Sequence, residues 1–93
     1  MNTYECSDGS RLTQSVIERL ITKAKAQKVR EQFDEHGFNF CEECERSSGT
    51  YIDCSHDVSV KKAKETSRTE LCFDVNNITM LCRKCHQIKD KLI

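Results

Sequence analysis

The stretch Cys82-Arg83-Lys84-Cys85-His86 decides how this chain is interpreted. Two cysteines separated by two residues can direct both thiolates toward one ion from a single tight turn. A second pair with the same spacing, Cys41 and Cys44, lies earlier in the chain. Four thiolates complete a tetrahedral site that suits zinc, so we expect these four cysteines to bind a structural Zn²⁺ ion.

The segment between the two cysteine pairs is longer than a minimal zinc ribbon needs. Residues 45–81 separate the pairs, whereas minimal ribbons use about 15–20 residues. The zinc ion is therefore expected to clamp the two ends of a larger insert. Three further cysteines give an odd total of seven, which excludes complete internal disulfide pairing. Cys54 and Cys72 are expected to be small buried hydrophobic residues, and Cys6 is either buried in the same way or exposed.

The composition indicates a small domain with a limited core. The chain has 93 residues, of which 32% are charged and 37% are hydrophobic. A chain of this size often needs a metal or a disulfide for stability. The sequence shows no signal peptide and no apolar run long enough to span a membrane, so no membrane partner is expected. A cytoplasmic location follows as an expectation, and cysteines bind metals there more often than they pair.

The formal charge is zero overall but is segregated along the chain. Residues 31–45 carry six carboxylates and neither Lys nor Arg, whereas residues 58–68 and residues 83–91 each carry a net charge of +3. A local basic face can bind phosphate even on a neutral chain. Each block taken alone is more often an ordinary solvated surface.

Turn-forming and apolar residues predict an α+β domain. Asp8-Gly9 indicates a tight hairpin turn near the start of the chain. Apolar residues three or four apart, after Thr13 or Ser15 as a cap and before Gly37 as a stop, predict a helix of about 20 residues. This apolar set comprises Val16, Ile17, Leu20, Ile21, Ala24, Val29 and Phe33. The stripe is expected to pack on the rest of the domain, while the basic side chains of the helix either lie along DNA or are solvated.

The second half of the chain predicts two short strands and a C-terminal helix. TYIDCSH (50–56) and NITML (77–81) indicate strands, and CRKCHQIKDKLI (82–93) indicates a helix. The segment between the strands, residues 59–75, has no clean period and is expected to be a loop, with or without a short helical turn. We divide the chain into a hairpin and basic amphipathic helix, residues 1–37, and a second domain, residues 38–93.

Three polar residues extend the cysteine pattern. His56, Asn77 and His86 follow one another within the zinc-clamped region, and His86 stands directly behind the last cysteine. With the four cysteines, the spacing N-x-x-x-L-C-x-x-C-H resembles the HNH endonuclease family, in its zinc-bearing form. In that form, Cys-x-x-Cys pairs bracket a ββα-metal motif, also called a His-Me finger. Leu81 and Lys89 match as well.

The resemblance covers residues 38–93, and the small size of the chain is similar to that of phage nucleases in this family. It implies a small α+β zinc-bound domain. In this domain a four-cysteine zinc site clamps the ββα-metal motif, with an N-terminal hairpin and a long helix preceding it. A phage-encoded protein of this kind acts in the host cytoplasm.

The implied activity is hydrolysis of DNA phosphodiester bonds, by nicking or by double-strand cleavage. A neutral imidazole accepts a proton near pH 7, which suits His56 as the general base. One divalent cation, Mg²⁺, Mn²⁺ or Ni²⁺, is expected on the scissile phosphate and the leaving oxygen, held partly by His86. Asn77 is expected to hold the loop or strand that orients His56, without touching the substrate.

The sequence departs from the family at one catalytic position. Many members have an Asp directly before the first His, as the second metal ligand, and this chain has Ser55 there. Asp53 lies two residues earlier, on the same face of a regular strand. We therefore expect Asp53 to be the ligand, directly or through water, with Asp57 as the second choice and Ser55 as the third.

DNA is the expected partner, mainly through its phosphates, which position a protein without giving it sequence specificity. The expected contact residues are Lys61, Lys62, Lys64, Arg68, Arg83 and Lys84. The resemblance implies that the C-terminal helix lies against the minor groove. Cleavage of both strands by so small a protein requires either a homodimer or two successive nicks.

Two other functions stay open from the sequence. In the first, the chain is a non-catalytic zinc-stabilised module that binds DNA or a protein. In the second, it is a regulator derived from an HNH nuclease, whose acidic segment 31–45 docks on a basic protein surface or masks the site. Either alternative requires only the zinc ion, whereas the nuclease requires a second, weaker metal site that includes His86. His36 is assigned no role.

Overall fold

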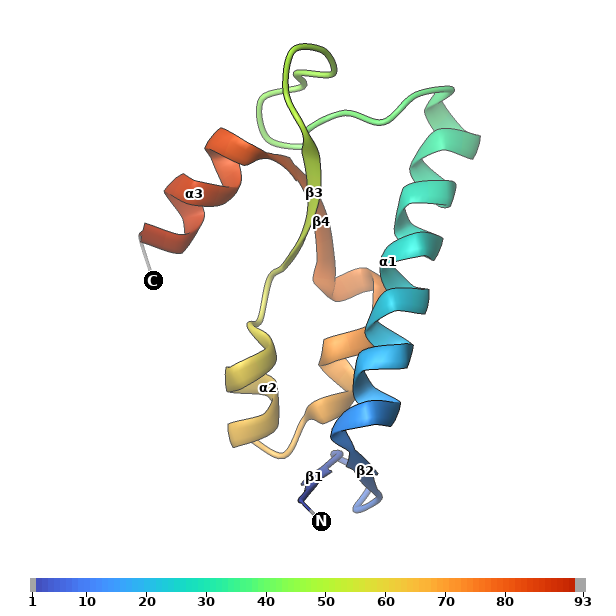
Figure 1. Ribbon diagram of the computed structural model, residues 1–93, viewed down its shortest axis with the longest axis vertical. Helices are drawn as coiled ribbons and strands as arrows, with labels where there is room; N and C mark the ends of the chain where they lie inside the picture. Colours follow the sequence, from blue (N-terminus) through green and yellow to red (C-terminus); the bar gives the residue numbers. More distant parts are fainter. Residues whose placement is uncertain (1, 92–93) are drawn as a thin grey trace.

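The computed structural model describes residues 2–91, with side chains as far as Lys89. Its elements are β1 (Thr3–Glu5), β2 (Arg11–Thr13), α1 (Gln14–His36), β3 (Ile52–His56), α2 (Val60–Glu65), η1 (Thr69–Phe73), η2 (Val75–Asn77), β4 (Ile78–Cys82) and α3 (Arg83–Lys91). The predicted α+β class is confirmed (Figure 1). Within the described residues, no helix is both long enough and apolar enough to cross a membrane.

The N-terminal hairpin and the long helix form where the sequence predicted them. β1 pairs antiparallel with β2, and Gly9 in the connecting turn has φ of 88°, which favours glycine. Helix α1 follows β2 directly. It ends at Gly37, whose φ is 82° and whose N–H donates to the carbonyl of Phe33.

The predicted apolar stripe of α1 is wrong in its second half. Ile17 is fully buried, but Val29 is 38% exposed and Phe33 is 54% exposed. Gln32 is buried in their place. Its amide donates to the carbonyl of Phe40 at 3.0 Å and accepts from the Phe40 N–H at 3.1 Å. The chain that follows Gly37 runs back along this side of the helix, so backbone polar groups cover it and an amide side chain satisfies them.

A second antiparallel pair, β3 with β4, lies at the centre of the molecule. Ile52 is opposite Cys82, and His56 is opposite Ile78. β4 passes directly into α3, so strand, strand and helix form one unit whose identity as a ββα-metal motif stays a prediction. The segment between the strands is more helical than the expected loop, because α2, η1 and η2 occupy most of it. Ser59 caps α2 by accepting from the Lys62 N–H at 3.1 Å, a cap signal present in the sequence.

The two-stranded sheet lies between α1 and α3 (Figure 1). Cys54 faces α1, where its sulfur lies 3.8 Å from the carbonyl oxygen of Lys25. A core cluster of Ile17, Ala63 and Cys72 joins α1 to the segment between the strands. The segments 1–37 and 38–93 therefore share a core, and the division between them stays a prediction. A second, smaller cluster forms around Cys41, Leu81 and Cys82.

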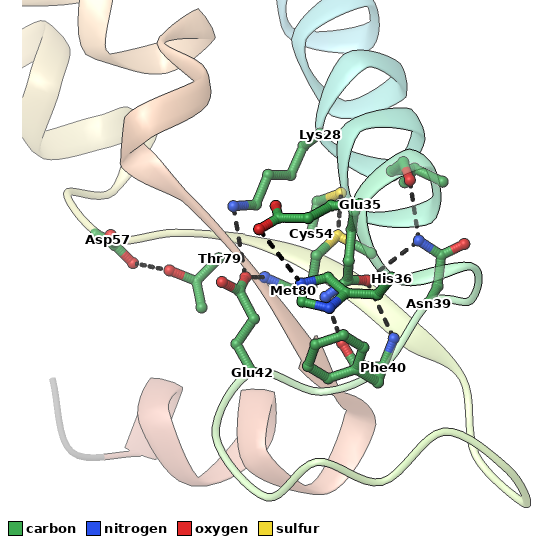
Figure 2. A network of polar contacts seen from close by, with 12 residues as sticks. Lys28, Glu35, His36, Asn39, Phe40, Glu42, Cys54, Asp57, Thr79 and Met80 are labelled. Carbon is green, nitrogen blue, oxygen red and sulfur yellow. Dashed lines mark hydrogen bonds and ion pairs between the residues drawn. The ribbon is translucent and has the colours of Figure 1, made fainter.

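Glu42, from the acidic segment 31–45, hydrogen-bonds to the edge of β4 that does not pair with β3. The backbone N–H of Glu42 donates to the carbonyl of Met80 at 2.8 Å, and the Glu42 carboxylate accepts from the Met80 N–H. Lys28 of α1 pairs with the same carboxylate at 3.6 Å, as Figure 2 shows. Glu42, one of the six carboxylates of the acidic segment, therefore stabilises the fold.

Candidate functional site

The four cysteines of the two Cys-x-x-Cys pairs converge on one point. Their sulfur atoms all lie within 4.8 Å of one another. Cys44 Sγ and Cys82 Sγ are 3.7 Å apart. A tetrahedral zinc ion with Zn–S bonds of about 2.3 Å requires about 3.8 Å between sulfurs, whereas a disulfide requires about 2.05 Å. The cluster therefore has the donor set and the spacing of a structural zinc site.

Backbone N–H groups support the charged form of two of these sulfurs. The N–H of Cys44 points to Cys41 Sγ at 3.4 Å, and the N–H of Cys85 points to Cys82 Sγ at 3.5 Å. Burial disfavours the Cys41 thiolate, but the N–H groups of Cys44, Cys82 and Glu43, together with the Cys44 thiol, outweigh it and lower the pKa of Cys41 to about 6. Thiolate is the form that binds zinc, so each turn is suited to its metal-binding role.

A ladder of side-chain pairs joins β3, with the residue before it, to α3. The pairs are Tyr51 with Arg83, Asp53 with His86, and Ser55 with Lys89. Alternate residues of a strand share one face, and residues three apart on a helix share one face. The three pairs therefore lie in register, and we call them the polar ladder. Arginine, histidine and lysine line the helical side of this interface.

The middle pair of the ladder is the best candidate for binding a second cation. Asp53 Oδ2 lies 3.6 Å from His86 Nδ1, and each side chain is about one-third exposed. Two ligands about 2.1 Å from one ion are separated by about 3.0–3.6 Å, depending on the bond angle. Among the described residues, only the four cysteines form a group of three or more potential metal ligands. Oxygen atoms of water or phosphate would have to complete a site at Asp53 and His86.

In the last pair of the polar ladder, Lys89 contacts Ser55 and Asp57, the two alternative candidates for the catalytic-metal ligand. The Lys89 ammonium donates to Ser55 Oγ at 2.9 Å and to the His56 carbonyl at 2.8 Å. It also lies 3.5 Å from Asp57 Oδ1, which accepts from the Thr79 hydroxyl at 2.7 Å. Ser55 and Asp57 are thus both held by an ammonium group, while Asp53 faces His86.

The side chain of His56 lies on the other face of β3. Its Nε2 lies 2.7 Å from the carbonyl oxygen of Cys72. Because a carbonyl only accepts, Nε2 carries the proton, and the lone pair of the neutral ring is on Nδ1. Asp53 and His56 therefore belong to different faces of β3, and a phosphate that meets both must lie across the end of the strand.

Asn77 fixes the chain that follows His56. Its Nδ2 donates to the carbonyls of Val58 and Leu71 at 3.0 and 2.9 Å, and its Oδ1 accepts from the Val58 N–H at 2.9 Å. Asn77 is only 7% exposed. The amide thereby joins the loop after His56 to η1, the same element whose Cys72 carbonyl holds the imidazole.

The basic residues expected to contact DNA fall into two groups. Lys61, Lys62 and Lys64 lie on α2, beyond the end of β3, whereas Arg83 and Lys84 begin α3 at the other end of the sheet (Figure 1). Lys64 donates to the Gln14 side chain and lies 4.3 Å from the centroid of the Tyr4 ring. Its charge is therefore directed toward the N-terminal segment.

The remaining predicted side chains have simpler surroundings. Cys6 and Cys72 are buried, and Cys54 is half-buried. His36 ends α1, with its ring edge-on to Phe40 at 5.0 Å between centroids. Arg68 is exposed and lies between α2 and η1.

Comparison with known proteins identifies no relative, because no protein-family model, curated protein or solved structure matches the chain. Function must therefore be argued from the residues. Sequence reasoning missed the contacts of Tyr51 and the anchoring role of Lys89. Their signal was a strand with polar or aromatic residues at every second position, followed by a helix with basic residues at every third position.

Proposed function

We propose that this protein is a metal-dependent endonuclease of the HNH type, which hydrolyses DNA phosphodiester bonds. The observation that carries the proposal is the pairing of His86 with Asp53 at 3.6 Å. His86 stands directly behind a Cys-x-x-Cys turn, so a structural zinc ion would fix the start of the helix that presents it. An imidazole and a carboxylate at this distance suit a divalent cation such as Mg²⁺, Mn²⁺ or Ni²⁺.

Each polar residue has a distinct role in this proposal. Asp53 and His86 would hold a divalent cation, which would supply Lewis-acid stabilisation of the charge that develops on the phosphate and the leaving oxygen. His56 takes the proton of the attacking water through Nδ1, while its bond to the Cys72 carbonyl orients the ring. Asn77 positions His56 by holding the loop that follows it.

Basic side chains at the two ends of the sheet bind the DNA backbone. Arg83 and Lys84 are exposed beside the candidate cation site, and Lys61 and Lys62 are exposed beyond His56. These charges lie at the two ends of β3, along the path that a phosphate backbone crossing the site would take. Contacts of this kind give little sequence preference and an affinity that falls with salt.

Cleavage of supercoiled plasmid by zinc-loaded protein tests the proposal. We expect nicked or linear product only when Mg²⁺, Mn²⁺ or Ni²⁺ is added. Asp53→Ala should lower the rate at least about tenfold, as the loss of a metal ligand or its support does. Asp34→Ala, which removes an exposed carboxylate of α1, is the matched control and should leave the rate unchanged.

Two results would count against these assignments. Full activity in Asp53→Ala would exclude Asp53 as a ligand. A parent protein that holds its zinc but cuts no plasmid with any of the three cations would contradict the nuclease proposal itself.

A non-catalytic nucleic-acid-binding module is the second candidate, and Lys89 favours it. The ammonium group is held among Ser55 Oγ, the His56 carbonyl and Asp57 Oδ1. A lysine whose three N–H groups are engaged in this way anchors the chain around His56 without any divalent cation, which is all that a non-catalytic module requires there. This candidate predicts DNA binding without cleavage, and no Mn²⁺ binding by the zinc-loaded protein. Titration of that protein with Mn²⁺, followed by electron paramagnetic resonance, separates the two candidates.

A further inference from the structure

We propose that Tyr51 and Arg83 form a stacking site for an unpaired nucleobase. The ligand is then single-stranded or locally opened nucleic acid, with one base on the Tyr51 ring. The proposal rests on the proposed function, because the base belongs to the strand whose phosphate would be cut at Asp53 and His86. Tyr51 is 73% exposed, more than the other exposed large hydrophobic residues described.

The exposed ring is held in place by its neighbours. The Tyr51 carbonyl accepts from the Arg83 N–H at 3.1 Å, and the Arg83 guanidinium carbon lies 5.0 Å from the ring centroid. The next residue, Ile52, already pairs with Cys82 in the sheet. A side chain that is ordered before binding loses little entropy when a ligand arrives. An aromatic ring left mostly in water contributes little to folding through burial, so its surface is available to a ligand.

The position of Tyr51 in the polar ladder puts its ring within reach of a nucleic acid bound at Asp53 and His86. It occupies the step next to Asp53 and His86, about 7 Å along the strand by ordinary β geometry. A phosphate at that pair carries its sugar and base with it, so a base on one side of the phosphate can reach the ring. Aromatic rings and guanidinium groups both stack on nucleobases, and arginine also contacts phosphate. A base inside a duplex has both faces covered by its neighbours, so the site selects an unpaired base.

The tyrosine content of the chain makes the contact directly observable. The protein has two tyrosines and no tryptophan, so Tyr4→Phe leaves Tyr51 as the sole strong fluorophore. We would titrate this zinc-loaded variant with single-stranded oligo(dT), oligo(rU) and a blunt DNA duplex, without added Mg²⁺ or Mn²⁺. We expect the single strands to quench the Tyr51 emission and the duplex to leave it largely unchanged. The comparison of oligo(dT) with oligo(rU) distinguishes DNA from RNA as the source of the base.

Substitution of Tyr51 tests how much the stacked base contributes to the binding affinity. Tyr51→Leu should weaken binding of the single strands about tenfold, the order expected for losing one stacked base. Tyr51→Phe should bind within about twofold of the parent, because the ring is retained. Phe33→Leu is the matched control, since it removes an exposed ring from α1, on the other side of the sheet. Zinc content and thermal unfolding of each variant establish that the fold is intact.

The outcomes separate this inference from the nuclease proposal. Quenching with weakened binding in Tyr51→Leu supports the stacking site, whether or not the parent cuts plasmid. Unchanged Tyr51 emission at saturation, equal single-strand affinity of Tyr51→Leu and parent, or no binding by the parent would overturn it. If plasmid is still cut in those cases, the nuclease proposal stands and only the stacking site fails.

Discussion

At the scale of single residues, Asn77 shows how one amide can organise a site. A side chain with two donors and an acceptor satisfies three backbone groups from two segments. No other residue type of this size offers both kinds of group in this arrangement. The expectation that Asn77 supports the chain near His56 could be formed from the sequence, but the partners Val58 and Leu71 depend on the fold of the segment between the strands.

Substitution of Asn77 should be severe for this reason. Asn77→Ala leaves buried backbone groups unpaired, and we expect the free energy of unfolding to fall by about 2–4 kcal/mol. Asn77→Asp should be at least as harmful, because a carboxylate oxygen would face two carbonyl oxygens. Urea denaturation of the zinc-loaded variants measures both effects.

Asn76→Ala is the matched control, because Asn76 is an exposed neighbour in η2 and should unfold like the parent. Equal midpoints for Asn77→Asp and the parent would show that the amide does not hold the loop.

At the scale of elements, α3 packs on β3 through polar groups. A helix that covers a sheet usually does so with an apolar stripe, whereas α3 presents Arg83, His86 and Lys89. Such an interface gains little from burial, so its stability depends on hydrogen bonds and on the metal site at its start.

Lys89 should account for a measurable share of this packing. Lys89→Met keeps the length of the side chain but leaves Ser55, which is 2% exposed, without its donor. We expect a loss of about 1–2 kcal/mol in the free energy of unfolding, the order for hydrogen bonds to a charged group. Lys62→Met, which changes an exposed lysine of α2, should have no comparable effect. Identical urea midpoints for the two variants would contradict the anchoring role of Lys89.

Several elements follow from local signals and others do not. The spacing of Cys41, Cys44, Cys82 and Cys85 predicted their convergence, because two residues between cysteines fix a turn that suits one metal. The end of α1 followed from Gly37, whose backbone conformation favours glycine. The extent of helix between the strands was not predicted, because α2, η1 and η2 are shorter than the window in which helical periodicity is visible.

The exposure of Val29 and Phe33 was not predicted either, for a different reason. Their spacing is that of a buried helical face, but the chain after Gly37 covers the Gln32 side of the helix and leaves these two outside. Burial is decided by the path of a loop that carries no periodic signal. The polar ladder was hidden for a similar reason, since its register depends on how β4 passes into α3.

At the scale of the whole molecule, the two hydrophobic clusters depend on the metal to different degrees. The cluster of Ile17, Ala63 and Cys72 contains no zinc ligand, whereas the other contains Cys41 and Cys82. Structural zinc sites supply about 10–16 kcal/mol of apparent binding free energy, as much as the net stability of a typical domain, about 5–15 kcal/mol. The end of the molecule that carries α3 should therefore require zinc.

Removal of zinc by a chelator should unfold that end first. Hydrogen exchange should show loss of amide protection in β3, β4 and α3, while α1 stays protected through its contacts with η1. Cys82→Ser should behave like the zinc-free protein, and Cys54→Ser, which changes a cysteine outside the cluster, should retain zinc. Equal protection with and without the metal would show that the cluster is not a structural zinc site.

We propose that this protein hydrolyses phosphodiester bonds with His56 as the base. The most direct measurement is the rate of plasmid nicking by zinc-loaded parent protein, His56→Ala and His36→Ala, with Mn²⁺ or Mg²⁺ added. We expect nicking by the parent and by His36→Ala, and a loss of about 100-fold or more in His56→Ala, the order for removing a general base. Equal nicking by His56→Ala and the parent, with zinc retained in both, would contradict it.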